Sequence, residues 1–154
     1  MENILHFLSE QISPLKFLGL FVSAICGMLI GFERQFYGKP AGIRTSILIC
    51  MGAYCFVALS SSLLADSTDH SRVVGQIVTG IGFLGAGIMF NNGALVQGVT
   101  SAAVIWVLAA IGCLIGFERY GAGLIMTLST LGTLLGITFL EKRIKNLTRG
   151  IHKT

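Results

Sequence analysis

The chain has 154 residues, of which 53% are hydrophobic and 12% charged, and its mean hydropathy is +0.80. A soluble domain carries about twice that charged fraction, so the composition excludes an ordinary soluble globular domain. The net charge of +4 does not indicate nucleic-acid binding, because the basic residues lie at the ends of apolar segments and in the C-terminal tail, not across a groove-sized face.

The residues before Pro14 predict a short interfacial helix, since Ile4, Leu5, Leu8 and Ile12 recur at helical spacing. The first charged residue is acidic, and no small-residue cleavage pattern follows the first apolar run. We therefore expect a retained anchor at this end and not a signal peptide.

Five later segments are long enough to cross a bilayer, which takes about 17–25 apolar residues. They cover residues 15–32, 45–64, 73–90, 100–117 and 121–140. The sequence thus predicts an all-α membrane protein, a bundle of about five transmembrane helices with a glycine-rich third helix. Residues 1–140 would form the membrane domain and 141–154 a basic cytoplasmic tail.

The basic residues predict the orientation of this bundle. Three lie between the first two spans and five in the tail, eight of the chain's 11 Lys and Arg residues. With five spans these two regions share one side of the membrane. Positive charge is retained in the cytoplasm, so we expect the C-terminus inside and the N-terminus outside the bacterial inner membrane.

The third span carries five glycines within 13 residues. In water each interior glycine costs a helix about 1 kcal/mol relative to alanine, whereas in a membrane small residues let helices approach closely. The sequence therefore predicts that this helix packs against a neighbour. The predicted packing residues are Gly75, Gly80, Gly82, Gly85 and Gly87.

Polar and ionisable residues at the borders of the spans are the candidate functional residues, because burying such groups in a membrane is costly. The set is Glu33, Arg34, Arg44, Thr45, Arg72, Gln76, Asn91, Asn92 and Thr100. Two interpretations stay open for the arginines: an ion-paired cluster around Glu33, or headgroup contacts at the membrane edge. Gln76 could bind a substrate or join two helices by a hydrogen bond.

The segment of residues 90–99 contains no charged residue, although it should be a cytoplasmic loop. It is either a re-entrant segment tucked into the protein or a tight helical hairpin. A second open question is a repeat: Leu-Ile-Gly-Phe-Glu-Arg occurs at 29–34 and at 114–119, as an inverted repeat would place it.

No set of residues indicates catalysis. There is no paired-carboxylate site, no nucleophile with its base and no metal-ligand cluster, so we expect neither an enzyme nor a cofactor or metal. The cysteines, Cys26, Cys50, Cys55 and Cys113, lie inside apolar segments without a CxxC pair and are expected to be buried.

Several motifs resemble the MgtC/SapB family of bacterial inner-membrane proteins. They are Gly-Phe-Glu-Arg-Gln at 31–35, Ala-Gly-Ile-Arg-Thr at 41–45, Arg72, the run 76–87, Gly-Val-Thr-Ser-Ala-Ala at 98–103, Trp106 and 109–112. Together they cover about residues 27–120 in order. Longer members add a C-terminal cytoplasmic domain, and we expect this chain to be a short form without it. Charged residues are common in the family where Asn91 and Asn92 stand, and Glu118-Arg119 stands where we expect an uncharged Gly-x pattern.

The resemblance implies a non-enzymatic role in adaptation to low magnesium and, in pathogens, in virulence. It also implies a membrane-protein partner, with the F-type ATP synthase as the candidate, and it leaves a homo-oligomer open. The alternative is a small magnesium transporter or transport accessory. Magnesium prefers carboxylate oxygens and water, and Glu33 and Glu118 are the carboxylates near membrane depth, at opposite ends of the predicted bundle.

Overall fold

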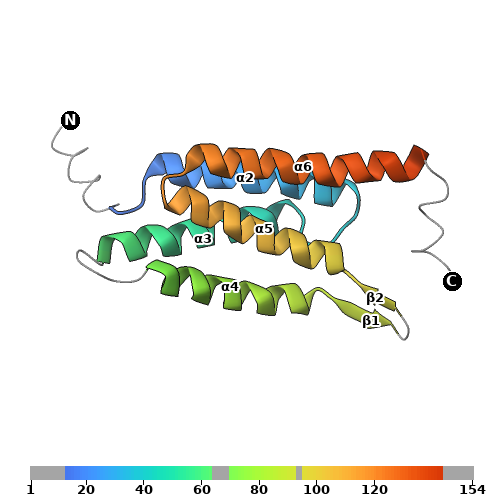
Figure 1. The fold of residues 1–154 in the computed structure, drawn as a ribbon, viewed down its shortest axis with the longest axis horizontal. Coiled ribbons are helices and arrows are strands. Elements are labelled where there is room, and N and C mark those ends of the chain that lie inside the picture. The colour runs from blue at the N-terminus through green and yellow to red at the C-terminus, as the bar shows by residue number, and fades with distance from the viewer. Residues whose placement is uncertain (1–12, 64–69, 93–94, 144–154) are drawn as a thin grey trace.

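The computed structural model describes residues 13–63, 70–92 and 95–143, which fold as a helical bundle (Figure 1). The described ranges contain five helices and one small two-stranded sheet. The helices are α2 (Phe17–Phe36), α3 (Ile43–Leu63), α4 (His70–Gly87), α5 (Val99–Gly116) and α6 (Tyr120–Arg143). The predicted all-α membrane fold is confirmed. The predicted interfacial helix and residues 144–154 of the predicted tail lie outside the described residues.

Four of the described helices are long and apolar enough to cross a membrane: α2, α3, α5 and α6. The third predicted span is also a helix, but α4 is not among these four. Its first two turns carry His70, Arg72 and Gln76, which lower its hydrophobicity. The five predicted helices are therefore present, and α4 is the one outside this set of four.

Consecutive helices run in opposite directions (Figure 1). At one end, here called the hairpin end, α2 and α6 finish, α3 and α5 begin, and a β-hairpin extends from α4 and α5. At the other end, here called the Lys16 end, α2, α4 and α6 begin and α3 and α5 finish. The loop between the first two predicted spans and the C-terminal end of α6 thus share one end, as the charge pattern requires.

The buried core lies between α2, α3 and α5, with α4 and α6 on opposite sides of it (Figure 1). Glycines let these three helices approach closely. A Cβ built on Gly27 would lie 2.6 Å from the carbonyl oxygen of Ser46, and one built on Gly112 would collide with the carbonyl of Cys50. Cys26, Cys50 and Cys113 are buried and Cys55 is half-buried, so the expected burial is met by three of the four.

The glycines of α4 do not provide this close packing. A Cβ built on Gly85 would lie 3.6 Å from the Cβ of Ala102, but one built on Gly75, Gly80, Gly82 or Gly87 would meet no atom within 4 Å. Among the described residues, these four glycines therefore make no close contact with a neighbouring helix. Their packing against a partner stays a prediction.

The uncharged segment after α4 is a β-hairpin, formed by β1 (Phe90–Asn92) and β2 (Leu95–Gln97) in antiparallel register. Of the two alternatives, the tight helical hairpin does not describe these residues, because Asn91 pairs with Val96 in the antiparallel ladder. The re-entrant position in the membrane stays a prediction. Gly98 then starts α5 with φ +89°, and a Cβ there would lie 2.5 Å from the carbonyl oxygen of Ile88. Only glycine fits this turn, which holds β2 against the end of α4.

Candidate functional site

A buried polar centre lies near the hairpin end, where the last two turns of α2 meet the first turn of α5. Glu33 and Arg34 are only 7% and 3% exposed, and Ser101 is 2% exposed. The Arg34 Nη2 donates a hydrogen bond of 2.6 Å to Ser101 Oγ, and its Nη1 lies 3.8 Å from Glu33 Oε2. These three residues, here called the Glu33–Arg34–Ser101 centre, join an acid, a base and a hydroxyl inside an apolar core.

The hydrogen bonding of this centre is incomplete. Glu33 Oε2 and Arg34 Nε are buried without a hydrogen-bond partner. An unsatisfied buried charged group costs free energy, and such groups concentrate at functional sites. The centre can therefore accept one donor at Glu33 and offer one donor from Arg34, a fit for a water molecule or a small polar group.

Local turn geometry fixes the position of Glu33 and Arg34. The carbonyl of Arg34 accepts a 2.8 Å bond from the Lys39 N–H, and Gly38 has a φ of +61°, which is the geometry of a glycine-ended helix. The Gln35 side chain accepts a hydrogen bond from the N–H of Ile43, so the end of α2 is tied to the start of α3. The centre is thus held by both helices and by α5.

The other predicted residues are not gathered into this centre. Arg44, Thr45 and Thr100 are exposed at the hairpin end. Arg72 and Gln76 are exposed on the first turns of α4, at the Lys16 end, so a single cluster of all nine residues is not formed. Asn91 and Asn92 lie in β1 at the hairpin end, and their side chains are outside the described residues.

Sequence reasoning missed Ser101 and chose its neighbour Thr100. A signal was present, because Thr100 and Ser101 stand together at the start of a span, and consecutive side chains of a helix point about 100° apart. Which of the two faces inward depends on how α5 packs on α2.

A groove of about 700 Å³ separates α4 from α3. Apolar side chains such as Leu48 and Phe56 line most of it, and Arg72, Gln76 and Gly80 line its α4 side. Gln76 is therefore placed on an open groove, and among the described residues it makes no hydrogen bond across to α3.

In the described part of the chain, no three His, Cys, Asp or Glu residues are grouped as a metal site would need. The Glu33–Arg34–Ser101 centre holds a single carboxylate beside a cation. The predicted lack of a bound metal stays a prediction.

Comparisons with known proteins give one consistent relation. Residues 20–143 match the sequence profile of the MgtC family. The chain is 52% identical over 92 residues to Protein MgtC of Brucella abortus, covering 60% of this chain and 38% of the relative. It is 44% identical over 130 residues to the putative magnesium transporter YhiD of Escherichia coli, covering 78% and 60%.

A third relative is Protein MgtC of Salmonella typhimurium, which is 38% identical over 130 residues, covering 84% of this chain and 55% of the relative. The chain therefore spans between about two fifths and three fifths of the length of these curated relatives. No solved structure matches the fold.

Proposed function

This chain belongs to the MgtC family and is a multi-pass membrane protein, and from that premise we propose that it is a non-enzymatic regulator of a larger complex in the bacterial inner membrane. The proposed physiological role is adaptation to low magnesium, with a role in virulence where the host bacterium is a pathogen. The F-type ATP synthase is the proposed partner, on the resemblance described above.

The observation that carries this proposal is the open side of α4. Its groove against α3 has a volume of about 700 Å³, and Phe83 is 81% exposed beside glycines with no neighbour. Small residues on a helix surface give lipid chains little contact energy. A second helix can approach such residues closely, and it can also form a hydrogen bond with a polar group such as Gln76. A transmembrane helix of a partner fits this surface.

The proposed orientation follows from the charges. The hairpin end, with the loop between α2 and α3, faces the cytoplasm, and the Lys16 end faces the outside. The Glu33–Arg34–Ser101 centre then lies near the cytoplasmic edge of the bilayer. There it stabilises the packing of α2 against α5 and fixes how the hairpin is presented to a partner.

Replacing Gly80 by leucine tests the α4 surface, because Gly80 lines the groove. No atom lies within 4 Å of a Cβ at this position, so the fold is expected to remain intact while a partner helix is kept away. We expect crosslinking of the chain to its partner in native membranes to fall by about tenfold, the factor given by a loss of about 1.4 kcal/mol of contact energy. Gly85 is unsuitable because it already packs on Ala102.

The matched control is Gly132 to leucine. Gly132 lies in α6, also with no atom within 4 Å of a Cβ, so the change adds the same side chain to the other side of the bundle. The control should crosslink as the unmodified chain does. Equal loss in both variants, or no loss in either, would refute partner binding through α4. Mass spectrometry of the crosslinked product identifies the partner and separates the ATP synthase from self-association.

The second candidate function is magnesium transport, which the name of the Escherichia coli relative, putative magnesium transporter YhiD, favours. The carboxylate of Glu33 has a free oxygen, but Glu118 lies at the other end of the bundle, and magnesium generally needs one or two carboxylates with retained water. We expect purified protein in liposomes to show no magnesium flux above protein-free liposomes, measured with an entrapped magnesium dye. A robust flux would overturn the regulatory proposal.

A further inference from the structure

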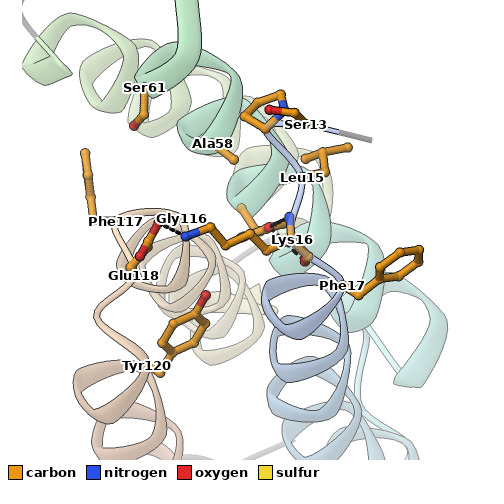
Figure 2. Close-up of a pocket in the computed structure, with 12 residues that line it drawn as sticks. Ser13, Leu15, Lys16, Phe17, Ala58, Ser61, Gly116, Phe117, Glu118 and Tyr120 are labelled. Carbon is orange, nitrogen blue, oxygen red and sulfur yellow. Dashed lines mark hydrogen bonds and ion pairs between the residues drawn. The ribbon is translucent and has the colours of Figure 1, made fainter. Parts of the chain in front are cut away.

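A second polar site lies at the Lys16 end, far from the Glu33–Arg34–Ser101 centre. It is a pocket of about 720 Å³ between the start of α2, the end of α3 and the turn from α5 to α6 (Figure 2). Lys16 and Glu118 face each other across it, with Lys16 Nζ 2.6 Å from Glu118 Oε1. The Tyr120 hydroxyl points towards this pair (Figure 2).

The backbone of Lys16 is held in place, while its ion-paired side chain is exposed. The buried Tyr54 hydroxyl accepts a 2.8 Å hydrogen bond from the Lys16 N–H and donates a 3.1 Å bond to the Lys16 carbonyl. The side chains of Lys16 and Glu118 are each 60% exposed. An exposed ion pair contributes little to stability, so a ligand can separate the two charges at low cost.

Glu118 stands in an unfavourable backbone conformation. The Glu118 N–H bonds to the Ile115 carbonyl and the Arg119 N–H to the Leu114 carbonyl, which is the usual glycine-ended finish of a helix. Its φ is +60°, where side chains are strained, while the corresponding residue at the end of α2 is Gly38 with φ +61°. Strain of this kind persists where a side chain is needed, and here it aims a carboxylate at the pocket.

The pocket combines this pair of opposite charges with an apolar, aromatic border. Phe17, at the start of α2, is 72% exposed, and Phe117 is 37% exposed. Both lie at the ends of helices that can span a membrane, at the level where aromatic rings meet lipid headgroups. A hydrogen bond from Lys16 to Glu118 raises the pKa of the Lys16 ammonium above its ordinary value, so Lys16 is cationic at neutral pH.

We infer that the Lys16–Glu118 pocket binds the headgroup of a membrane phospholipid that carries a primary ammonium and a phosphate, as phosphatidylethanolamine does. The ammonium donates hydrogen bonds to Glu118 and the phosphate accepts them from Lys16, so that one ligand satisfies both charges. The acyl chains lie beside Phe17 and Phe117. Phosphatidylcholine satisfies only Lys16, because its quaternary ammonium has no hydrogen to donate, and phosphatidylglycerol has no ammonium.

Native mass spectrometry of the detergent-purified chain, with phosphatidylethanolamine and phosphatidylcholine of identical acyl chains, tests this. We expect the first lipid to be retained about tenfold more, the ratio that one charged hydrogen bond supports. Soluble phosphoethanolamine at the same concentration is expected not to displace it. Equal retention of the two lipids, or equal competition by phosphoethanolamine, would overturn the inference.

The decisive variant is Glu118→Gly. It removes the carboxylate and also relieves the strained backbone, so the melting temperature is expected to equal or exceed that of the unmodified chain. The preference for phosphatidylethanolamine should fall to within about twofold of parity, and Lys16→Gln should weaken retention of both lipids alike. Arg119→Gln, which changes the next charge along the chain outside the pocket lining, should leave the preference unchanged. A Glu118→Gly protein that keeps the tenfold preference refutes the site.

Discussion

Replacing Arg34 by methionine is expected to destabilise the folded chain by about 3–5 kcal/mol, the cost of leaving one partner of a buried ion pair uncompensated. The Glu33 carboxylate, 7% exposed, would lose its cation, and Ser101 Oγ would lose its 2.6 Å donor. The measurement is unfolding of the detergent-purified protein, followed by helical circular dichroism as a function of added denaturing detergent.

Three variants make this result specific. Arg44 to methionine removes an exposed arginine at the same end and should change stability by less than about 0.5 kcal/mol. Ser101 to alanine removes one hydrogen bond and should cost about 1–3 kcal/mol. Changing Glu33 to glutamine together with Arg34 to methionine should recover part of the loss, because no charge is then left buried. If Arg34 to methionine unfolds no more easily than Arg44 to methionine, the centre is not the buried ion pair described above.

Much of the architecture follows from the sequence because a bilayer imposes strong constraints. Apolar stretches of about 20 residues must be helices in a membrane, and the positions of Lys and Arg fix which ends lie together. The spans of α2, α3, α5 and α6 and their alternating directions could therefore be predicted. The β-hairpin of residues 90–97 could not, because three-residue strands leave no periodic pattern in the sequence.

Which glycines lie at close helix contacts could not be predicted from the sequence. A glycine shows only that a backbone can be approached, and the approach itself depends on the neighbouring helix. Gly27, Gly31 and Gly112 are among the residues at which α2, α3 and α5 come close, although the denser glycine run lies in α4. The prediction followed the dense glycine run of α4. The close helix contacts in the structure are made instead by single, widely spaced glycines, each facing a neighbouring helix.

The candidate site could also be predicted from the sequence only in part. Glu33 and Arg34 stand out in the sequence because charge is rare inside a span, and the structure buries both. Ser101 and the pocket at Lys16 and Glu118 depend on distances between residues 67 and 102 positions apart in the chain. The two copies of the repeat Leu-Ile-Gly-Phe-Glu-Arg also differ in structure. Glu33, in the first copy, lies inside a helix, whereas Glu118, in the second copy, lies just beyond the end of one.

Replacing Gly112 by alanine is the second change with a large expected effect. The added methyl group would collide with the Cys50 carbonyl and approach the Ala53 Cβ to 2.7 Å, and neither is the far end of a flexible side chain. Helices α3 and α5 must then move apart in the centre of the core. Overpacking of this kind costs about 1–3 kcal/mol, so the unfolding midpoint should fall clearly.

Replacing Gly80 by alanine should have the opposite effect on stability. A Cβ there meets no atom within 4 Å, and alanine is preferred over glycine in a helix by about 1 kcal/mol, so the chain should be equally or more stable. Both variants add one methyl group to a helical glycine, and the difference between them measures close packing alone. Equal unfolding midpoints would mean that α3 and α5 do not approach through Gly112. A loss at Gly80 as large as that at Gly112 would mean that α4 is packed within the isolated protein.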